Sequence, residues 1–124
     1  MDASIAQANE LPLEYVDKAR LVRLQREVAA EGRCTRPGTD PERWFPVEPS
    51  PKATTKRREY EWVAKIRCNG CRAKTRCLLT ALAEEKDLPY GDASGIRGGK
   101  APWQRDEIRR NASNNAGVST EEAA

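Results

Sequence analysis

The cysteine pattern is the feature that most constrains this chain. Cys68, Cys71 and Cys77 form a C-x2-C-x5-C arrangement, Cys34 is the only other cysteine, and the 124 residues contain no histidine. A C-x2-C segment places two sulfurs on one tight turn, close enough to bind one metal centre. The sequence therefore predicts a single site with four thiolate ligands.

The residues around the C-x2-C turn fit such a site. Because Asn69 and Gly70 both tolerate left-handed backbone angles, we expect the turn to direct amide N–H groups at the sulfurs. Four basic residues lie close by in the sequence: Arg67, Arg72, Lys74 and Arg76. Positive neighbours lower the pKa of a thiol and offset the negative charge of a thiolate-bound metal centre. The sequence thus predicts thiols that ionise easily.

The residues alone do not identify the metal. Structural zinc accepts four thiolates, although it usually takes them as two close pairs, and an iron–sulfur cluster is equally compatible with this spacing. Two structural disulfides would be typical of a secreted protein, but residues 1–10 lack a basic-then-apolar signal pattern. No apolar run approaches membrane-spanning length either. We therefore expect a cytoplasmic protein, in which a metal is favoured over disulfides.

Composition predicts one small domain between two flexible ends. With 33% charged and 38% hydrophobic residues, the chain has little material for a core, so a metal site would supply much of its stability. Residues 1–10 and 111–124 are small and polar, and we expect them to be flexible, with a single domain at 11–110. Between Lys52 and Arg76 nine Lys or Arg residues face two Glu, a basic block that could serve an anionic cluster or nucleic acid.

Helical periodicity predicts an all-α fold. The expected helices span residues 13–31 (between Pro12 and Gly32), from a cap at Thr54 or Thr55 to about residue 67, 73–86, and 103–110 after Pro102. The buried side of the second should be Tyr60, Val63, Ala64 and Ile66, with Trp62 on another face. No strand pattern of any length appears, so we predict a small four-helix arrangement organised around the cysteines.

Trp44 and Phe45 stand out in the proline-rich loop at residues 36–51. Two adjacent aromatic residues in a polar loop need a surface to cover. They could pack beneath the loop or contact a partner, and the sequence leaves both interpretations open.

The chain resembles the WhiB-like (Wbl) family of iron–sulfur transcription regulators, because several of these features occur in the same order along the sequence. That family carries an isolated cysteine, then C-x2-C-x5-C, then a turn of the form G-[VI]-W-G-G. Here the turn reads Gly95-Ile96-Arg97-Gly98-Gly99, and Cys77-Leu78-x-x-Ala81-Leu82 and Trp44-Phe45-Pro46 also match. The resemblance covers about residues 34–110. One departure is Arg97, which stands where the family has tryptophan; Trp103 could compensate for it.

The resemblance implies a redox- or nitric-oxide-responsive regulator. Cys34, Cys68, Cys71 and Cys77 would ligate one 4Fe-4S cluster per chain, at the centre of the helical fold. The partner would be the C-terminal domain of the primary sigma factor within RNA polymerase holoenzyme. Contact residues would be Trp44, Phe45, Gly95, Ile96, Arg97, Gly98, Gly99 and Trp103. Metal-free members of the family are also described as forming disulfides and as thiol–disulfide reductases.

Contact with promoter DNA should be weak. Some family members end in a basic tail, whereas here Arg109 and Arg110 are followed only by polar residues and two glutamates. The residues expected to contact DNA are Arg109, Arg110, Lys52, Lys56, Arg57 and Arg58.

Two other functions remain as hypotheses. One is a zinc-stabilised module that binds protein or nucleic acid, and the other is a thiol–disulfide reductase using Cys68 and Cys71, although the βαβ context of that chemistry is absent. Without histidine or a recognisable carboxylate pair we expect no hydrolytic catalysis and no small-molecule substrate, so the chain is predicted not to be an enzyme.

Overall fold

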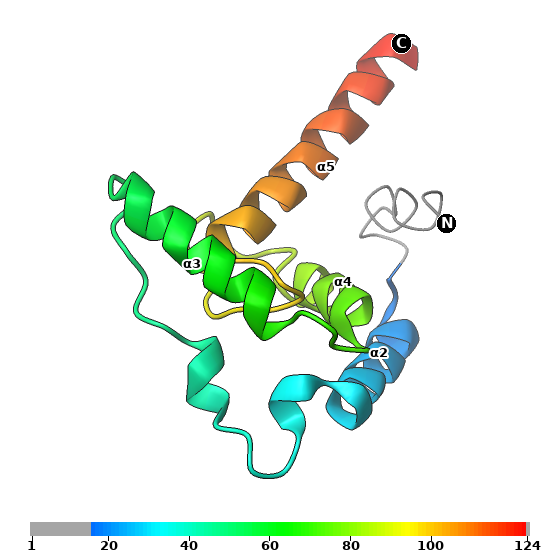
Figure 1. Cartoon of the computed structure of the whole chain (residues 1–124). Coiled ribbons are helices and arrows are strands. Elements are labelled where there is room, and N and C mark those ends of the chain that lie inside the picture. The colour runs from blue at the N-terminus through cyan, green and yellow to red at the C-terminus, as the bar shows by residue number, and fades with distance from the viewer. Residues whose placement is uncertain (1–15, 124) are drawn as a thin grey trace.

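In the computed structural model of the chain, backbone is described for residues 16–123 and side chains for residues 16–112. The elements in chain order are α2 (Lys18–Glu31), the 3-10 helices η2 (Arg33–Thr35) and η3 (Pro41–Trp44), α3 (Thr54–Arg67), α4 (Lys74–Glu84) and α5 (Pro102–Ala123) (Figure 1). Over residues 16–123 there is no strand, only an isolated antiparallel bridge between Arg97 and Lys100. The predicted all-α fold with four α-helices is confirmed for this part of the chain.

Helix α2 begins later than the sequence predicted. Asp17 is its N-cap, and the Asp17 carboxylate accepts a hydrogen bond from the Arg20 backbone N–H at 2.8 Å. A helix beginning at residue 13 would deprive that N–H of its cap, which is why the start shifts; Pro12 and Leu13 themselves lie outside the described residues. The predicted end is confirmed, because Gly32 closes the helix with its N–H on the Val28 carbonyl at 2.7 Å.

Helix α3 ends at Arg67 as predicted, but it begins at Thr54 without the predicted threonine cap. The residue before it is Ala53, so no threonine side chain caps the helix. Tyr60 and Ala64 are buried as expected, and Trp62 is 64% exposed, also as expected. Ile66 is 42% exposed and lies one helical turn from Trp62, so the prediction that these two residues occupy different faces is wrong.

Helices α4 and α5 differ from the prediction mainly in length. Helix α4 is shorter than 73–86 and buries Ala81 and Leu82. Helix α5 starts at Pro102 as predicted, since proline is tolerated in the first turn. It then continues past Arg110 to Ala123, because no proline interrupts this alanine-containing stretch. Predictions for the 1–10 end and for side chains beyond residue 112 lie outside the described part.

Two kinds of packing hold the helices together. The buried core consists of Trp44, Tyr60, Ala64, Cys68, Ile96 and Ala101. It is therefore formed where η3, α3, the loop at residues 95–99 (the glycine loop) and the residue before α5 meet. Helices α2 and α4 lie side by side (Figure 1) and are joined by polar groups. Gln25 donates to the Glu84 carboxylate at 2.7 Å, and Arg76 pairs with Glu27 and Glu31.

Candidate metal centre

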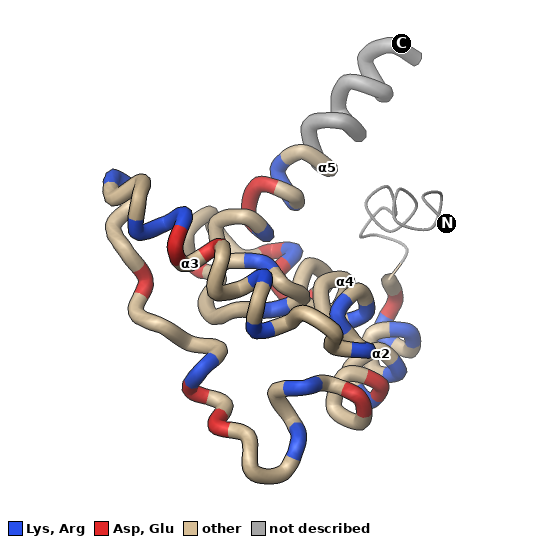
Figure 2. The backbone as a smooth tube through the Cα atoms, viewed as in Figure 1, with Lys and Arg blue, Asp and Glu red and all other residues tan. Residues whose placement is uncertain are grey.

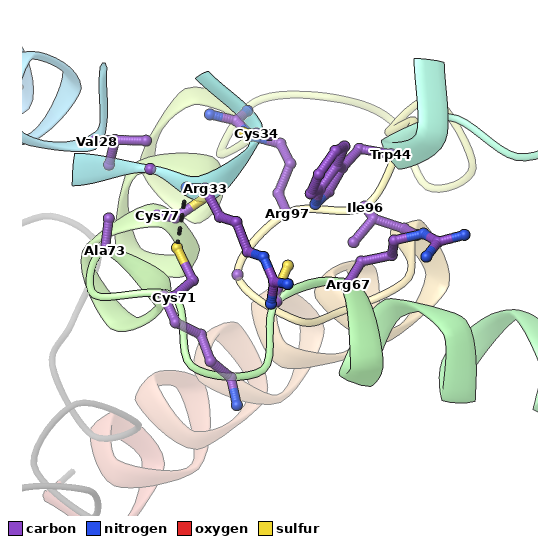
Figure 3. Close-up of a pocket in the computed structure, with 14 residues that line it drawn as sticks. Val28, Arg33, Cys34, Trp44, Arg67, Cys71, Ala73, Cys77, Ile96 and Arg97 are labelled. Carbon is purple, nitrogen blue, oxygen red and sulfur yellow. Dashed lines mark hydrogen bonds between the residues drawn. The ribbon is translucent and has the colours of Figure 1, made fainter. Parts of the chain in front are cut away.

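All four cysteines line one cavity, although they come from different elements. Cys34 lies in η2, Cys68 is the C-cap of α3, Cys71 follows three residues later, and Cys77 lies in the second turn of α4. Each cysteine is free, so no disulfide joins them. Figure 3 shows Trp44, Ile96 and Arg67 on one side of this cysteine cavity and Val28, Ala73 and Cys71 on the other. The predicted convergence of the cysteines on one place is therefore observed.

The cysteine cavity is narrow, with a volume of about 20 Å³. Side chains of Arg33 and Arg97 help to line it (Figure 3). Within residues 16–112 no three Cys, Asp or Glu side chains are grouped closely enough to hold a single metal ion. The donors thus suit a thiolate-ligated centre in kind and number. A bound group larger than one ion would require the arginine side chains to move aside.

Backbone N–H groups reach the sulfurs from outside the C-x2-C turn. The Arg33 N–H donates to Cys71 Sγ at 3.4 Å. The backbone amides of Gly98 and Gly99 lie near Cys77 and Cys68 and lower the pKa of these two thiols. The prediction that the Asn69–Gly70 turn supplies these donors is wrong. That turn hydrogen-bonds internally, from the Cys71 N–H to the Cys68 carbonyl at 3.1 Å, and only its glycine has a positive φ.

The Gly98–Gly99 pair has a backbone that only glycine adopts readily. Their φ angles are 59° and 76°, and Arg97 and Lys100 on either side exchange two backbone hydrogen bonds of 3.1 and 3.2 Å. Positive φ at both central residues is the signature of a type I′ turn. A Cβ on Gly98 would lie 2.6 Å from the Leu78 Cα, so glycine also permits the turn to lie directly on α4.

A buried arginine in α5 supports this glycine loop from behind. Arg105 is 0% exposed, and it donates to the backbone carbonyls of Ser94, Gly95 and Lys100 at 2.8–2.9 Å. Its charge is balanced by Glu85 at the end of α4. The sequence does not reveal this arrangement, because Arg105 looks like one more basic residue of a surface helix. One available signal is the spacing of four residues between Arg105 and the apolar Ala101, which places both on one helical face, and both are buried.

Burial, rather than nearby positive charge, has the largest effect on the pKa values of Cys34, Cys68 and Cys77. Desolvation raises the pKa of Cys68, against the lowering effect of hydrogen bonds from the Gly99 amide and the Trp44 side chain. Burial also raises the pKa of Cys77, opposed by the Gly98 amide and then by the Arg97 charge. The pKa of Cys34 is raised by burial and by the nearby Cys77. The predicted lowering of these pKa values is therefore wrong in the metal-free chain.

The basic neighbours of the cysteines divide into two groups. Arg67 and Lys74 line the cysteine cavity, whereas Arg76 turns to α2 and pairs with Glu27 and Glu31. Arg72 is exposed and does not line the cavity. Arg97, predicted as a partner contact, also lines the cysteine cavity, where it lowers the pKa of Cys77. Its guanidinium pairs with Glu84 at 2.5 Å.

The predicted partner contacts separate into buried and exposed residues. Trp44 and Ile96 are buried in the core beside the cysteine cavity, and Trp103 packs on Tyr60 at 4.8 Å between ring centroids and donates to Glu61 at 2.6 Å. These three therefore have structural contacts in the free chain. Phe45 is 59% exposed and lies against Gly95, where an added Cβ would be 2.5 Å from its ring.

Some of the residues predicted to contact DNA are exposed, and others already have partners within the chain. Lys52, Lys56 and Arg58 are exposed. Arg109 is buried in ion pairs with Glu85 and Asp106, and Arg57 stacks over Trp103 at 4.3 Å, so both already have intramolecular partners. Arg110 is exposed over the Tyr90 ring. Buried, paired charges cannot reach a phosphate, so the prediction fails for Arg109 and weakens for Arg57.

Comparison with protein-family models, with curated proteins and with solved structures finds no match to this chain. The family resemblance therefore rests on the motifs of the chain itself. Among the described helices, none combines the length and apolar character needed to cross a bilayer.

Proposed function

We propose that this chain is a WhiB-like regulator, which binds one 4Fe-4S cluster through Cys34, Cys68, Cys71 and Cys77. The observation that carries the proposal is the meeting of all four thiols at one cavity, where the Arg33 N–H donates to Cys71 and the amides of Gly98 and Gly99 lie near Cys77 and Cys68. Hydrogen bonds to the sulfurs and nearby positive charge are ways in which proteins stabilise and tune such clusters.

The order of the motifs favours a cluster over a single zinc ion. Four thiolates suit either centre. The isolated Cys34, the C-x2-C-x5-C segment and the glycine loop follow one another as in the WhiB-like family, whose members hold 4Fe-4S clusters.

A groove of about 380 Å³ lies beside the glycine loop, and its lining includes Phe45, Leu88 and Asp92. We propose that this groove receives the C-terminal domain of the primary sigma factor. A domain that reads promoter DNA is basic, and the exposed Asp92 carboxylate, which has no ion pair among the described residues, complements it. The exposed Phe45 ring supplies an apolar anchor.

The cluster is tested by anaerobic purification followed by absorbance, iron and sulfide analysis. We expect a brown protein with about four irons and four sulfides per chain, and loss of iron in each single Cys→Ser variant. A colourless protein carrying one zinc would overturn the redox regulator and support the zinc module instead.

The partner is tested separately by measuring affinity for the isolated sigma domain. Phe45→Ala and Leu88→Ala should weaken binding about tenfold or more, as expected for an anchor residue. Val47→Ala is the matched control, because Val47 is 94% exposed yet lies outside the groove. Equal effects of all three variants would contradict the assignment of this surface.

A further inference from the structure

A second cavity, lined by four arginines, lies next to the cysteine cavity. Its volume is about 380 Å³, and its basic residues are Arg33, Arg36, Arg43 and Arg67, with Asp40 as the one acidic residue. They come from η2 and the residue after it, from η3, and from the last residue of α3. Figure 2 shows basic positions recurring along the segment between α2 and η3 that borders this arginine pocket.

The charges of the arginine pocket are not balanced within the chain. Over residues 16–112, none of its four guanidinium groups has a carboxylate at ion-pair distance, whereas Arg76, Arg97, Arg105 and Arg109 all do. The Asp40 carboxylate is engaged as the N-cap of η3, accepting the Glu42 N–H at 3.0 Å. Four like charges around one space repel one another, and a bound anion would remove that cost.

The arginines are also under-used as hydrogen-bond donors. Arg33 donates one guanidinium N–H, to the Asn69 carbonyl at 2.8 Å. The Nε of Arg67 is buried and, among the described residues, has no hydrogen-bond partner. Figure 3 shows the Arg67 guanidinium pointing away from the cysteines. A buried guanidinium N–H without a partner is costly, and a ligand oxygen at this position would satisfy it.

We propose that the arginine pocket binds a small phosphorylated molecule of the nucleoside di- or triphosphate class. Guanidinium groups pair with phosphate oxygens through two parallel hydrogen bonds, which lysine cannot reproduce. The volume lies in the range of small-molecule sites, about 300–1,000 Å³. Trp44 and Ile66 add apolar lining against which the non-phosphate part of the ligand can rest.

The concave arrangement of the charges favours a small ligand over DNA. The arginines surround a concave space on the loop side of the fold, whereas exposed Lys52, Lys56 and Arg58 belong to the outer surface around α3. A duplex backbone is contacted along an open surface, with phosphates spread over several nucleotides. The proposal does not depend on the cluster, because none of its steps requires a metal in the cysteine cavity.

Isothermal titration calorimetry of the full chain tests the proposal, with adenosine triphosphate and inorganic pyrophosphate as probes. Arg36→Gln and Arg43→Gln should each weaken binding about tenfold or more, since hydrogen bonds to charged groups are strong. Both residues are exposed and have no ion pair to lose, so folding should be unaffected, as circular dichroism would verify. Arg58→Gln is the matched control, an exposed arginine of α3 outside the pocket.

Three results would overturn the proposal. The first is an affinity that falls equally in Arg58→Gln and in the Arg36→Gln/Arg43→Gln double variant. The second is binding of sulfate as tight as that of pyrophosphate, which would indicate general anion attraction. The third is tight binding of a short DNA duplex that the double variant loses, without binding of either small probe, which would assign these arginines to a nucleic-acid backbone.

Discussion

The Arg105 guanidinium donates from Nε and Nη2 to the two carboxylate oxygens of Glu85, both at 3.0 Å, and both side chains are buried. This pair joins the end of α4 to the first turns of α5. Through its Nη1 and Nη2 atoms Arg105 also holds three carbonyls of the glycine loop, which in turn presents Gly98 and Gly99 to the sulfurs. The geometry at the cysteines thus depends on an ion pair on the other side of the loop.

Removing Arg105 should destabilise the protein strongly. Arg105→Ala removes one of the two buried arginines that pair with the Glu85 carboxylate. Loss of one member of a buried ion pair costs about 3–5 kcal/mol. The control is Arg76→Ala, which removes solvent-exposed pairs to Glu27 and Glu31 and should cost far less than the loss of Arg105. Urea unfolding at pH 7 measures both. Similar losses in the two variants would show that burial of the Arg105 pair is unimportant.

A side chain at Gly98 should be far more harmful than one at Gly70. Both glycines have positive φ, 59° and 75°, so an alanine at either site carries a similar backbone cost of about 1–2 kcal/mol. Only Gly98 lies on α4, with the Leu78 N and Cα both 2.6 Å from an added Cβ, whereas the space around Gly70 is open. We expect Gly98→Ala to exceed Gly70→Ala by about 1–3 kcal/mol in urea unfolding, the usual range for overpacking. Equal losses would mean that the loop can lift off α4 freely.

Tyr60 should make stability fall at high pH. It is 5% exposed, its hydroxyl has no hydrogen-bond partner among the described residues, and burial raises the pKa of Tyr60 to about 12. An unfolded tyrosine ionises near pH 10, so the folded state retains the proton longer. Its contribution is fully present below pH 10 and is lost as pH rises towards 12, by on the order of 2–3 kcal/mol.

Tyr60→Phe isolates this effect from the cysteines, which also ionise at high pH. At pH 7 the variant should be as stable as the parent or slightly more so, because it removes a buried hydroxyl without a partner. Above pH 10 its advantage in the free energy of unfolding should grow. A constant difference between the two proteins from pH 7 to pH 11.5 would show that Tyr60 does not titrate as its burial implies.

Truncation of the neighbouring residues Trp44 and Phe45 should lower the stability of the protein to very different extents. Trp44 is buried against Cys68 and Ile96, so Trp44→Ala should lower the free energy of unfolding by about 3–5 kcal/mol. Phe45 is mostly exposed, so Phe45→Ala should change stability by less than about 1 kcal/mol. Thermal or urea unfolding of both variants checks this. A large loss in Phe45→Ala would mean that its ring mainly stabilises the Gly95 turn.

Local patterns predicted the elements well. The apolar spacing and Gly32 gave the end of α2, and Pro102 gave the start of α5. The positions of Cys68 at the C-terminus of α3 and of Cys77 early in α4 were predicted from the same patterns, and both residues line the cysteine cavity. These features depend on residues a few positions apart, whose periodicity and turn preferences are visible in the sequence.

Features that depend on tertiary contact were missed. The sequence alone does not show that Arg105 is buried while Arg110 is exposed, because both are arginines of one helix. The donors to the sulfurs were placed in the wrong turn for the same reason, since Arg33, Gly98 and Gly99 approach only when distant segments pack. The four arginines of the second cavity are likewise separated along the chain and brought together by the loop.

The burial of Trp44 beside Cys68 also gives the protein an optical reporter of its own. Of the three tryptophans, Trp62 is exposed to water and Trp103 stacks on Tyr60, whereas Trp44 alone lines the cysteine cavity. An absorbing group held by the sulfurs would therefore quench Trp44 emission by energy transfer over a very short distance. Fluorescence of a Trp62→Phe variant would then follow filling and emptying of the cavity without any added label.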